Sequence, residues 1–178
     1  MSKDILNYSF DKTWNYENGF YLTSHPTRLA KSIAHYELYK SIINLPGEIV
    51  ECGVLKGCSL IRFATFREML ENPYSRKLIA FDAFGEFPIA ENASIHDQNF
   101  AKGFHENVGS GIAVTELEQV LQHKHITNYQ LIAGDVLQTI PQYCLENQQI
   151  KISLLHLDMD VYHPTKIALE HFFEKIVP

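Results

Sequence analysis

Apolar and polar positions along this 178-residue chain repeat an order of strand and then helix. Downstream of Pro26, apolar side chains recur at spacings of three and four, which is typical of a helix; they are Leu29, Ile33, Tyr36, Tyr39 and Ile43. Short β-prone runs occupy 48–52, 77–82, 129–133 and 150–157, and helical periodicity returns over 59–71 and 114–123 and again from Pro164. A strand, a tight turn and a helix open a βαβ unit, so the pattern predicts an α/β fold with a parallel sheet.

Two segments do not follow this pattern. Residues 1–25 are aromatic and polar without a clear period, which indicates an N-terminal arm that precedes a domain over 26–178. Residues 83–111 contain four glycines and one proline and are longer than an ordinary connection. We therefore expect a functional loop or lid over 83–111.

Composition narrows the classes of function. The length suits one domain, the net charge is −6, and no run of lysine or arginine forms a basic stripe. This argues against nucleic acid or a membrane surface as a partner. The polar N-terminus has no apolar stretch of signal-peptide length, so we expect a cytoplasmic protein. Cys52, Cys58 and Cys144 include no C-x-x-C pair, and we interpret them as small buried hydrophobes.

All four predicted strands finish on acidic residues. They are Glu51, Asp82, Asp135 and the pair Asp158 and Asp160. A single acid in such a place is usually a helix cap or a loop residue. In an open parallel sheet, however, ligands bind outside the carboxyl ends of the strands. The set therefore predicts a binding site at that rim.

The turn after the first strand carries only two glycines, Gly53 and Gly57. A dinucleotide fingerprint would read G-x-G-x-x-G, so a pyrophosphate cradle is poorly supported. Glycine at these positions lets the backbone approach a ligand closely, and Glu51 favours a ligand with ammonium or hydroxyl groups. A plain connection between strand and helix is the alternative interpretation.

Four segments carry a resemblance to a known family. They are PGEIVECGVLKGCS (46–59), FDAFGEFP (81–88), AGDVLQTIP (133–141) and LLHLDMDVYHPT (154–165). In this order they resemble the motifs of the macrocin O-methyltransferase (TylF-like) family of S-adenosylmethionine-dependent enzymes. The resemblance covers about 26–178. It implies a Rossmann-like class I methyltransferase fold, with a parallel sheet and helices on both of its faces.

The resemblance also implies the residues that bind S-adenosylmethionine. Glu51 and Gly53 would lie at the methionine end of the cofactor, together with Gly57 and Ser59 of the same turn. Asp82 would accept hydrogen bonds from the two ribose hydroxyls, as a carboxylate can. Gly134 and Asp135 would lie near the adenine.

Members of this family methylate a hydroxyl of a deoxysugar, which is nucleotide-linked or attached to a glycan or antibiotic, and they use Mg²⁺. A divalent cation held by carboxylates can bind sugar oxygens and lower the pKa of one hydroxyl. The resemblance makes Asp158 the first metal ligand and a candidate general base. Asp160 is the second metal candidate and the weaker one, because we expect it to face away from Asp158 if the strand continues.

Sequences of this family continue beyond the point that corresponds to Pro178. They add a Gly-Gly turn, a fifth strand and an Asp-Asp-Tyr motif with two further metal ligands, and then two more strands. We therefore expect a chain truncated after strand four and its helix, unless a partner chain supplies the missing edge. We also expect a homo-oligomer that acts on a sugar or nucleotide-sugar. A non-catalytic cofactor-binding subunit and an NAD-dependent nucleotide-sugar enzyme are the alternatives.

Overall fold

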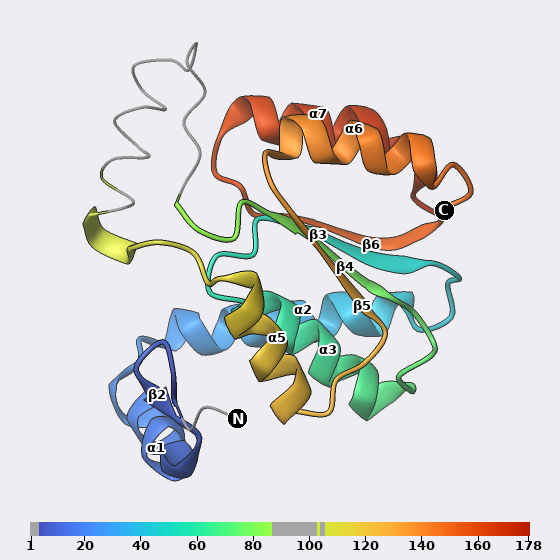
Figure 1. Cartoon of the computed structure of the whole chain (residues 1–178). Helices are drawn as coiled ribbons and strands as arrows, with labels where there is room; N and C mark the ends of the chain where they lie inside the picture. The colour runs from blue at the N-terminus through green and yellow to red at the C-terminus, as the bar shows by residue number, and fades with distance from the viewer. Residues whose placement is uncertain (1–3, 87–102, 104–105) are drawn as a thin grey trace.

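The computed structural model describes residues 4–86, 103 and 106–178, and a four-stranded parallel sheet forms its centre (Figure 1). The strands lie in the order β5-β4-β3-β6, and each pairs in parallel with its neighbours. Their bounds are Glu48–Cys52 (β3), Leu78–Asp82 (β4), Tyr129–Ala133 (β5) and Ile152–Leu157 (β6). The predicted α/β fold with a parallel sheet is confirmed.

Helices cover both faces of the sheet. One layer contains α2 (Pro26–Ile42), α3 (Cys58–Leu70) and α5 (Val114–His123), and the other contains α6 (Val136–Glu146) and α7 (Tyr162–Phe172) (Figure 1). Successive side chains of a strand point to opposite faces. Ile49 accordingly joins the core under α2 and α3, and Val50 joins the core under α6 and α7. Because both faces are covered, most residues of the central strands are apolar.

Helix α6 is missing from the elements that the sequence pattern predicted, and Pro141 lies inside it. Proline removes a backbone donor and usually breaks a helix. Here the helix persists because Ile140, Tyr143 and Cys144 are buried against the sheet. Parallel strands also need a crossover of a dozen or more residues, and α6 provides it between β5 and β6.

The buried face of α2 differs from the one that the apolar spacing suggests. His35, Tyr39 and Ile42 are buried, whereas Leu29 is 42% exposed and Ile33 is 54% exposed. Since α2 packs against α3 and β6, its inward face is the one that carries these polar and aromatic side chains.

The N-terminal arm contains a short antiparallel pair, β1 (Asp4–Ile5) and β2 (Tyr8–Ser9), a 3-10 turn η1 (Phe10–Lys12) and the helix α1 (Thr13–Thr23). Helix α1 has no buried residue. The arm meets the domain where Phe10 stacks on His123 of α5, with ring centroids 3.8 Å apart.

The predicted loop over 83–111 lies mostly outside the described residues, which omit 87–102 and 104–105. Its two described ends are tied together near the turn after β3. The amide of Gly111 donates to the Gly85 carbonyl at 2.6 Å, and the amide of Ile112 donates to the Leu55 carbonyl at 2.6 Å. The ends of this segment therefore lie beside the carboxyl rim of the sheet.

After α7 comes a 3-10 turn, η2 (Phe173–Lys175). Ile176 then forms a parallel bridge with Ile152, and the amide of Val177 donates to the Ile152 carbonyl at 2.9 Å. The outer edge of β6 is thus paired at its first residue. Across the described ranges, we find no helix that is both long and apolar enough to cross a membrane.

Candidate functional site

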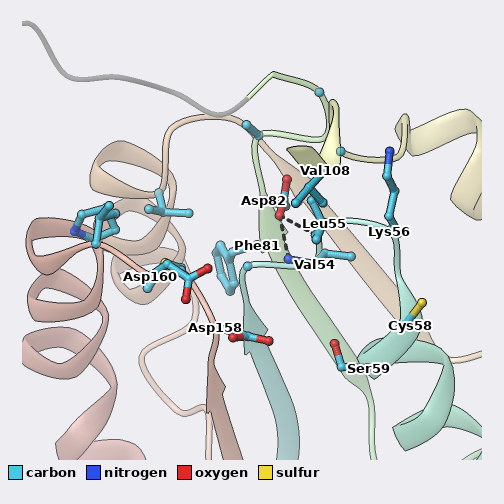
Figure 2. A pocket seen from close by; sticks show the side chains of 18 of the residues that line it. Val54, Leu55, Lys56, Cys58, Ser59, Phe81, Asp82, Val108, Asp158 and Asp160 are labelled. Atoms are coloured by element: carbon cyan, nitrogen blue, oxygen red, sulfur yellow. Dashed lines mark hydrogen bonds between the residues drawn. The ribbon is translucent and has the colours of Figure 1, made fainter. Parts of the chain in front are cut away.

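A cavity of about 550 Å³ opens at the carboxyl ends of β3, β4 and β6 (Figure 2). Five of the residues that the sequence singled out line it: Gly53, Ser59, Asp82, Asp158 and Asp160. They come from segments far apart in the chain, and the parallel sheet brings them together because its strands all end at the same rim. Apolar side chains such as Val54, Phe81 and Met159 form part of the lining, as is usual for small-molecule sites.

Asp82 holds the turn that follows β3. Its Oδ2 accepts hydrogen bonds from the amides of Val54, at 2.6 Å, and Leu55, at 3.1 Å (Figure 2). Its Oδ1 accepts one from the amide of Phe84 at 2.7 Å. A carboxylate offers about four acceptor positions. The backbone uses three of them, so Asp82 has less capacity for two ribose hydroxyls than the sequence suggested.

Glu51 does not line the cavity but lies fully buried beside it. Its Oε1 accepts a hydrogen bond from the hydroxyl of Ser59 and lies 3.4 Å from Nδ1 of His156, the residue paired with it across the sheet. Its Oε2 has no hydrogen-bond partner among the described residues. Burial raises the pKa of the Glu51 carboxyl above its ordinary value. Ser59 therefore connects Glu51 to the cavity.

Both glycines of the turn have left-handed backbone conformations, which favour glycine. Gly53 has φ +91°, and a Cβ there would also lie 2.2 Å from the carbonyl oxygen of Asp158. Gly57 has φ +79°, and a Cβ there would meet only the flexible end of Leu117, at 2.9 Å from Cδ1. Gly57 does not line the cavity, so its backbone conformation explains it without a ligand. Gly53 lets the turn touch the segment that carries Asp158.

The expectation that Asp160 faces away from Asp158 is wrong. Residues two apart in a strand share a face, so even a continuing strand would have kept the two side chains together. Strand β6 ends at Leu157, and Asp160 has φ +61°, so both residues belong to the turn that follows the strand. Both side chains line the cavity, and in Figure 2 they project from the same segment. Burial and then the neighbouring charge of Asp158 raise the pKa of the Asp160 carboxyl.

This pair of carboxylates suits the chemistry of a magnesium site in part. Mg²⁺ prefers oxygen ligands and is often held by one or two carboxylates, with water and substrate completing the shell. In the described part of the chain, no group of three or more His, Cys, Asp or Glu side chains could hold a metal ion. Asp158 already has a cationic partner, since its Oδ2 lies 3.1 Å from Nζ of Lys31 on α2.

Sequence reasoning missed the basic wall of the cavity. Arg28 and Lys31 of α2, Lys56 of the turn and Arg62 of α3 all line it. Nη1 of Arg62 lies 3.4 Å from Nδ1 of His35, and Lys56 donates to the carbonyl of Ser110. Burial, followed by the charges of His156, Arg62 and Lys31, lowers the pKa of His35 to about 4. The spacing of 28, 31 and 35 on one helix face was the available signal.

Three other predicted residues have positions that differ from expectation. Gly134 and Asp135 do not line the cavity. Asp135 caps α6 instead, with Oδ1 accepting from the amide of Leu137 at 2.9 Å. The expectation that all three cysteines are buried is wrong for Cys58, which is exposed in the first turn of α3 and lines the cavity. Cys52 and Cys144 are buried.

Comparisons with known proteins agree with this geometry. The family model for macrocin-O-methyltransferase (TylF) matches residues 32–178. One similar solved structure is the apo structure of CalS11, a TDP-rhamnose 3'-O-methyltransferase in calicheamicin biosynthesis. Its sequence is 27% identical to this chain, and its TM-score is 0.61. The match covers 93% of this chain and 66% of that one. A second structure of CalS11, described as calicheamicin methyltransferase, is 25% identical with a TM-score of 0.63, covering 93% of this chain and 67% of that one.

The O-methyltransferase NovP shares the fold, with 20% identity, a TM-score of 0.70, and coverage of 82% of this chain and 60% of that one. This chain thus spans about two thirds or less of the length of these solved structures. A search among curated proteins found no match.

Proposed function

This chain belongs to the macrocin O-methyltransferase (TylF) family, and from that premise we propose that it transfers a methyl group from S-adenosylmethionine to a hydroxyl of a sugar, or forms part of an enzyme that does so. One observation carries the proposal. Ser59, Asp82, Asp158 and Asp160 surround one cavity at the carboxyl rim of the sheet. The apo structure of CalS11, at 27% identity, supports it because that protein is described as a TDP-rhamnose 3'-O-methyltransferase.

The cofactor supplies an electrophilic methyl group on a sulfonium. Asp82 fixes the backbone of Val54 and Leu55, and the apolar side chains of Phe81 and Met159 offer contact for the adenosine part. Ser59, in the first turn of α3, lines the cavity and donates its hydroxyl hydrogen bond to Glu51. Direct contacts of Glu51, Gly57, Gly134 and Asp135 with the cofactor are predictions, since these residues lie outside the lining of the cavity.

The proton of the sugar hydroxyl must leave for the oxygen to attack a methyl group. We assign this proton to the carboxylate of Asp158, which lines the cavity and is held in place by Lys31 and by the hydrogen bond from its own amide to the Cys52 carbonyl at 2.9 Å. Asp158 and Asp160 are also the residues that would hold Mg²⁺. That ion would lower the pKa of the hydroxyl and orient it.

The family match favours methyl transfer over NAD-dependent chemistry. The glycine turn agrees, because both of its glycines are explained by their left-handed backbone conformations, and the third glycine of a dinucleotide fingerprint is absent. We further propose that the protein acts in the cytoplasm and that it forms a homo-oligomer. Sedimentation of the purified chain would check the oligomeric state.

The proposal is tested by thermal melts of this chain with S-adenosylhomocysteine or NADH. A ligand that binds only the folded state at 100 times its Kd adds about 2.7 kcal/mol of stability and must raise the Tm. We expect a rise with S-adenosylhomocysteine and none with NADH. A rise with NADH alone would reject the methyltransferase assignment.

Methyl transfer is then measured from radiolabelled S-adenosylmethionine to sugar nucleotides and neutral glycosides, with Mg²⁺ or with EDTA. Asp158→Asn should keep its response to S-adenosylhomocysteine and lose transfer, whereas Glu170→Gln, an exposed residue of α7, should keep both. Binding of S-adenosylhomocysteine that ignores Mg²⁺, without transfer to any acceptor, would favour a non-catalytic subunit.

A further inference from the structure

The charges of the cavity are separated between its two sides. The segment after β6 carries the acids Asp158 and Asp160, whereas the wall formed by α2 and α3 carries Arg28, Lys31 and Arg62. Such a division is notable in a chain whose net charge is −6. A ligand that fits this cavity should present hydroxyl or cationic groups to one side and an anionic group to the other.

Two of these cations are available to a ligand. Lys31 is paired with Asp158, and Lys56 donates to a backbone carbonyl. The guanidinium of Arg28 makes no hydrogen bond or ion pair with the described part of the chain, and Arg62 contacts only the ring nitrogen of His35 there. Arginine offers a planar fork of donors that matches phosphate oxygens.

The charges of the expected ligands also call for an anion. The described lining is balanced, because its four bases, Arg28, Lys31, Lys56 and Arg62, match its four acids, Asp82, Glu86, Asp158 and Asp160. S-adenosylmethionine adds a sulfonium, an ammonium and a carboxylate, and a magnesium ion would add two further positive charges. A neutral acceptor would leave the cavity strongly positive. An acceptor with a diphosphate would offset that charge.

The distances along α2 fit a sugar between the two sides. Lys31 touches Asp158, where the reacting hydroxyl is proposed to lie, and Arg28 precedes Lys31 by three residues. Three residues of α-helix advance about 4.5 Å, which is comparable to the width of a pyranose ring. A hydroxyl at Asp158 would therefore place a substituent across the ring near Arg28.

We propose that the acceptor is a sugar that carries a diphosphate on its anomeric oxygen, as in a nucleoside diphosphate sugar, and that Arg28 and Arg62 bind the diphosphate. This inference rests on the proposed function and narrows its substrate to an anionic sugar, rather than a neutral glycan or antibiotic. The carboxylate of the cofactor is a competing anion for the same arginines, so the experiment must separate the two.

The experiment uses calorimetric titration of the 178-residue chain with inorganic pyrophosphate, thymidine diphosphate and neutral methyl rhamnoside. EDTA is present throughout so that a metal ion cannot bridge the phosphate. Each titration is done with and without saturating S-adenosylhomocysteine. The variants are Arg28→Gln and Arg62→Gln, and Lys40→Gln is the matched control because it removes one positive charge from the exposed side of α2.

We expect both diphosphates to bind the wild type, with and without S-adenosylhomocysteine, and more weakly as salt is raised. Each arginine variant should weaken this binding roughly tenfold or more, since a hydrogen bond to a charged group typically contributes that much. Lys40→Gln should change it less than twofold. Methyl rhamnoside should bind equally to all variants.

Three outcomes would overturn the proposal. One is the absence of diphosphate binding to the wild type, and another is diphosphate binding that the two arginine variants leave unchanged. The third is a result in which pyrophosphate competes with S-adenosylhomocysteine and the variants also lose S-adenosylhomocysteine binding. That result would assign the two arginines to the cofactor. A chain that binds diphosphate but not S-adenosylhomocysteine would instead contradict the proposed function and leave the anion site supported.

Discussion

The hydrogen bonds of Asp82 allow a quantitative prediction. Its carboxylate accepts three backbone amides, and two of them belong to the buried residues Val54 and Phe84. Each buried donor left without a partner costs roughly 1–3 kcal/mol. The substitution Asp82→Ala should therefore lower the free energy of unfolding by about 2–6 kcal/mol, a large part of the roughly 5–15 kcal/mol typical of a domain.

The conservative substitution Asp82→Asn should be milder. An asparagine oxygen has two lone pairs and can still accept from Val54 and Leu55, whereas its amide group faces the amide of Phe84 as a second donor. One buried donor is then unsatisfied, so we expect a loss of about 1–3 kcal/mol. The variant should stay folded and allow the affinity for S-adenosylhomocysteine to be measured.

The assay is urea unfolding followed by far-UV circular dichroism, with linear extrapolation to water. Hydrogen exchange at the amides of Val54 and Phe84 gives a local readout. Both amides should lose protection in Asp82→Ala, and that of Phe84 should lose it in Asp82→Asn. Glu170→Gln serves as the surface control. A loss below about 1 kcal/mol for Asp82→Ala, or equal losses for the two variants, would refute the assignment of Asp82 as a brace of the turn.

Three further predictions concern the same site. Gly53→Ala should destabilise the fold and misplace Asp158, because a Cβ would lie 2.2 Å from the Asp158 carbonyl; unfolding and a methyl-transfer assay check this, and a wild-type profile would contradict it. Cys58 should be the one cysteine that iodoacetamide modifies in the native chain, since the other two are buried and burial raises their pKa values. S-adenosylhomocysteine should slow that modification, which mass spectrometry can follow. Burial holds the pKa of His35 at about 4, below its ordinary 6.5, so the unfolded state binds more protons between these values and stability falls as the pH is lowered through this window. His35→Phe should reduce this dependence in urea melts at stepped pH, and identical slopes for both proteins would argue against it.

Much of the fold follows from local patterns. Strands β3 and β5 and helix α5 have the bounds that the sequence pattern predicted, and the other predicted elements differ from it by only a few residues. The sequence pattern did not identify α6, although two successive parallel strands need a crossover between them. That need was itself visible in the sequence once two successive parallel strands were predicted.

The site was predictable in part and for a definite reason. The acids at the strand ends are local features, and the rule that parallel strands end at one rim converts them into a cluster. The rule does not say which side chains enter the cavity. Asp135 became a helix cap and Glu51 became buried beside Ser59, although each lies near the carboxyl end of a strand as Asp82 does.

The sequence by itself determined the order of elements, the position of the turn at Gly53 and the set of acids at the rim. These depend on the spacing of apolar residues and on backbone preferences, which act over a few neighbouring residues. It also determined that Asp158 follows a buried strand. Each of these features could be read without knowing what the rest of the chain does.

Only the tertiary structure decided which face of α2 points inward, and with it the basic wall of the cavity. The helix carries apolar residues on one side and Lys31, His35 and Tyr39 on another, so its own pattern does not select a face. Packing against α3 and β6 makes the selection and brings Lys31 to Asp158, which is 127 residues away in the chain. Contacts between such distant residues depend on how the layers pack, and no local pattern contains that information.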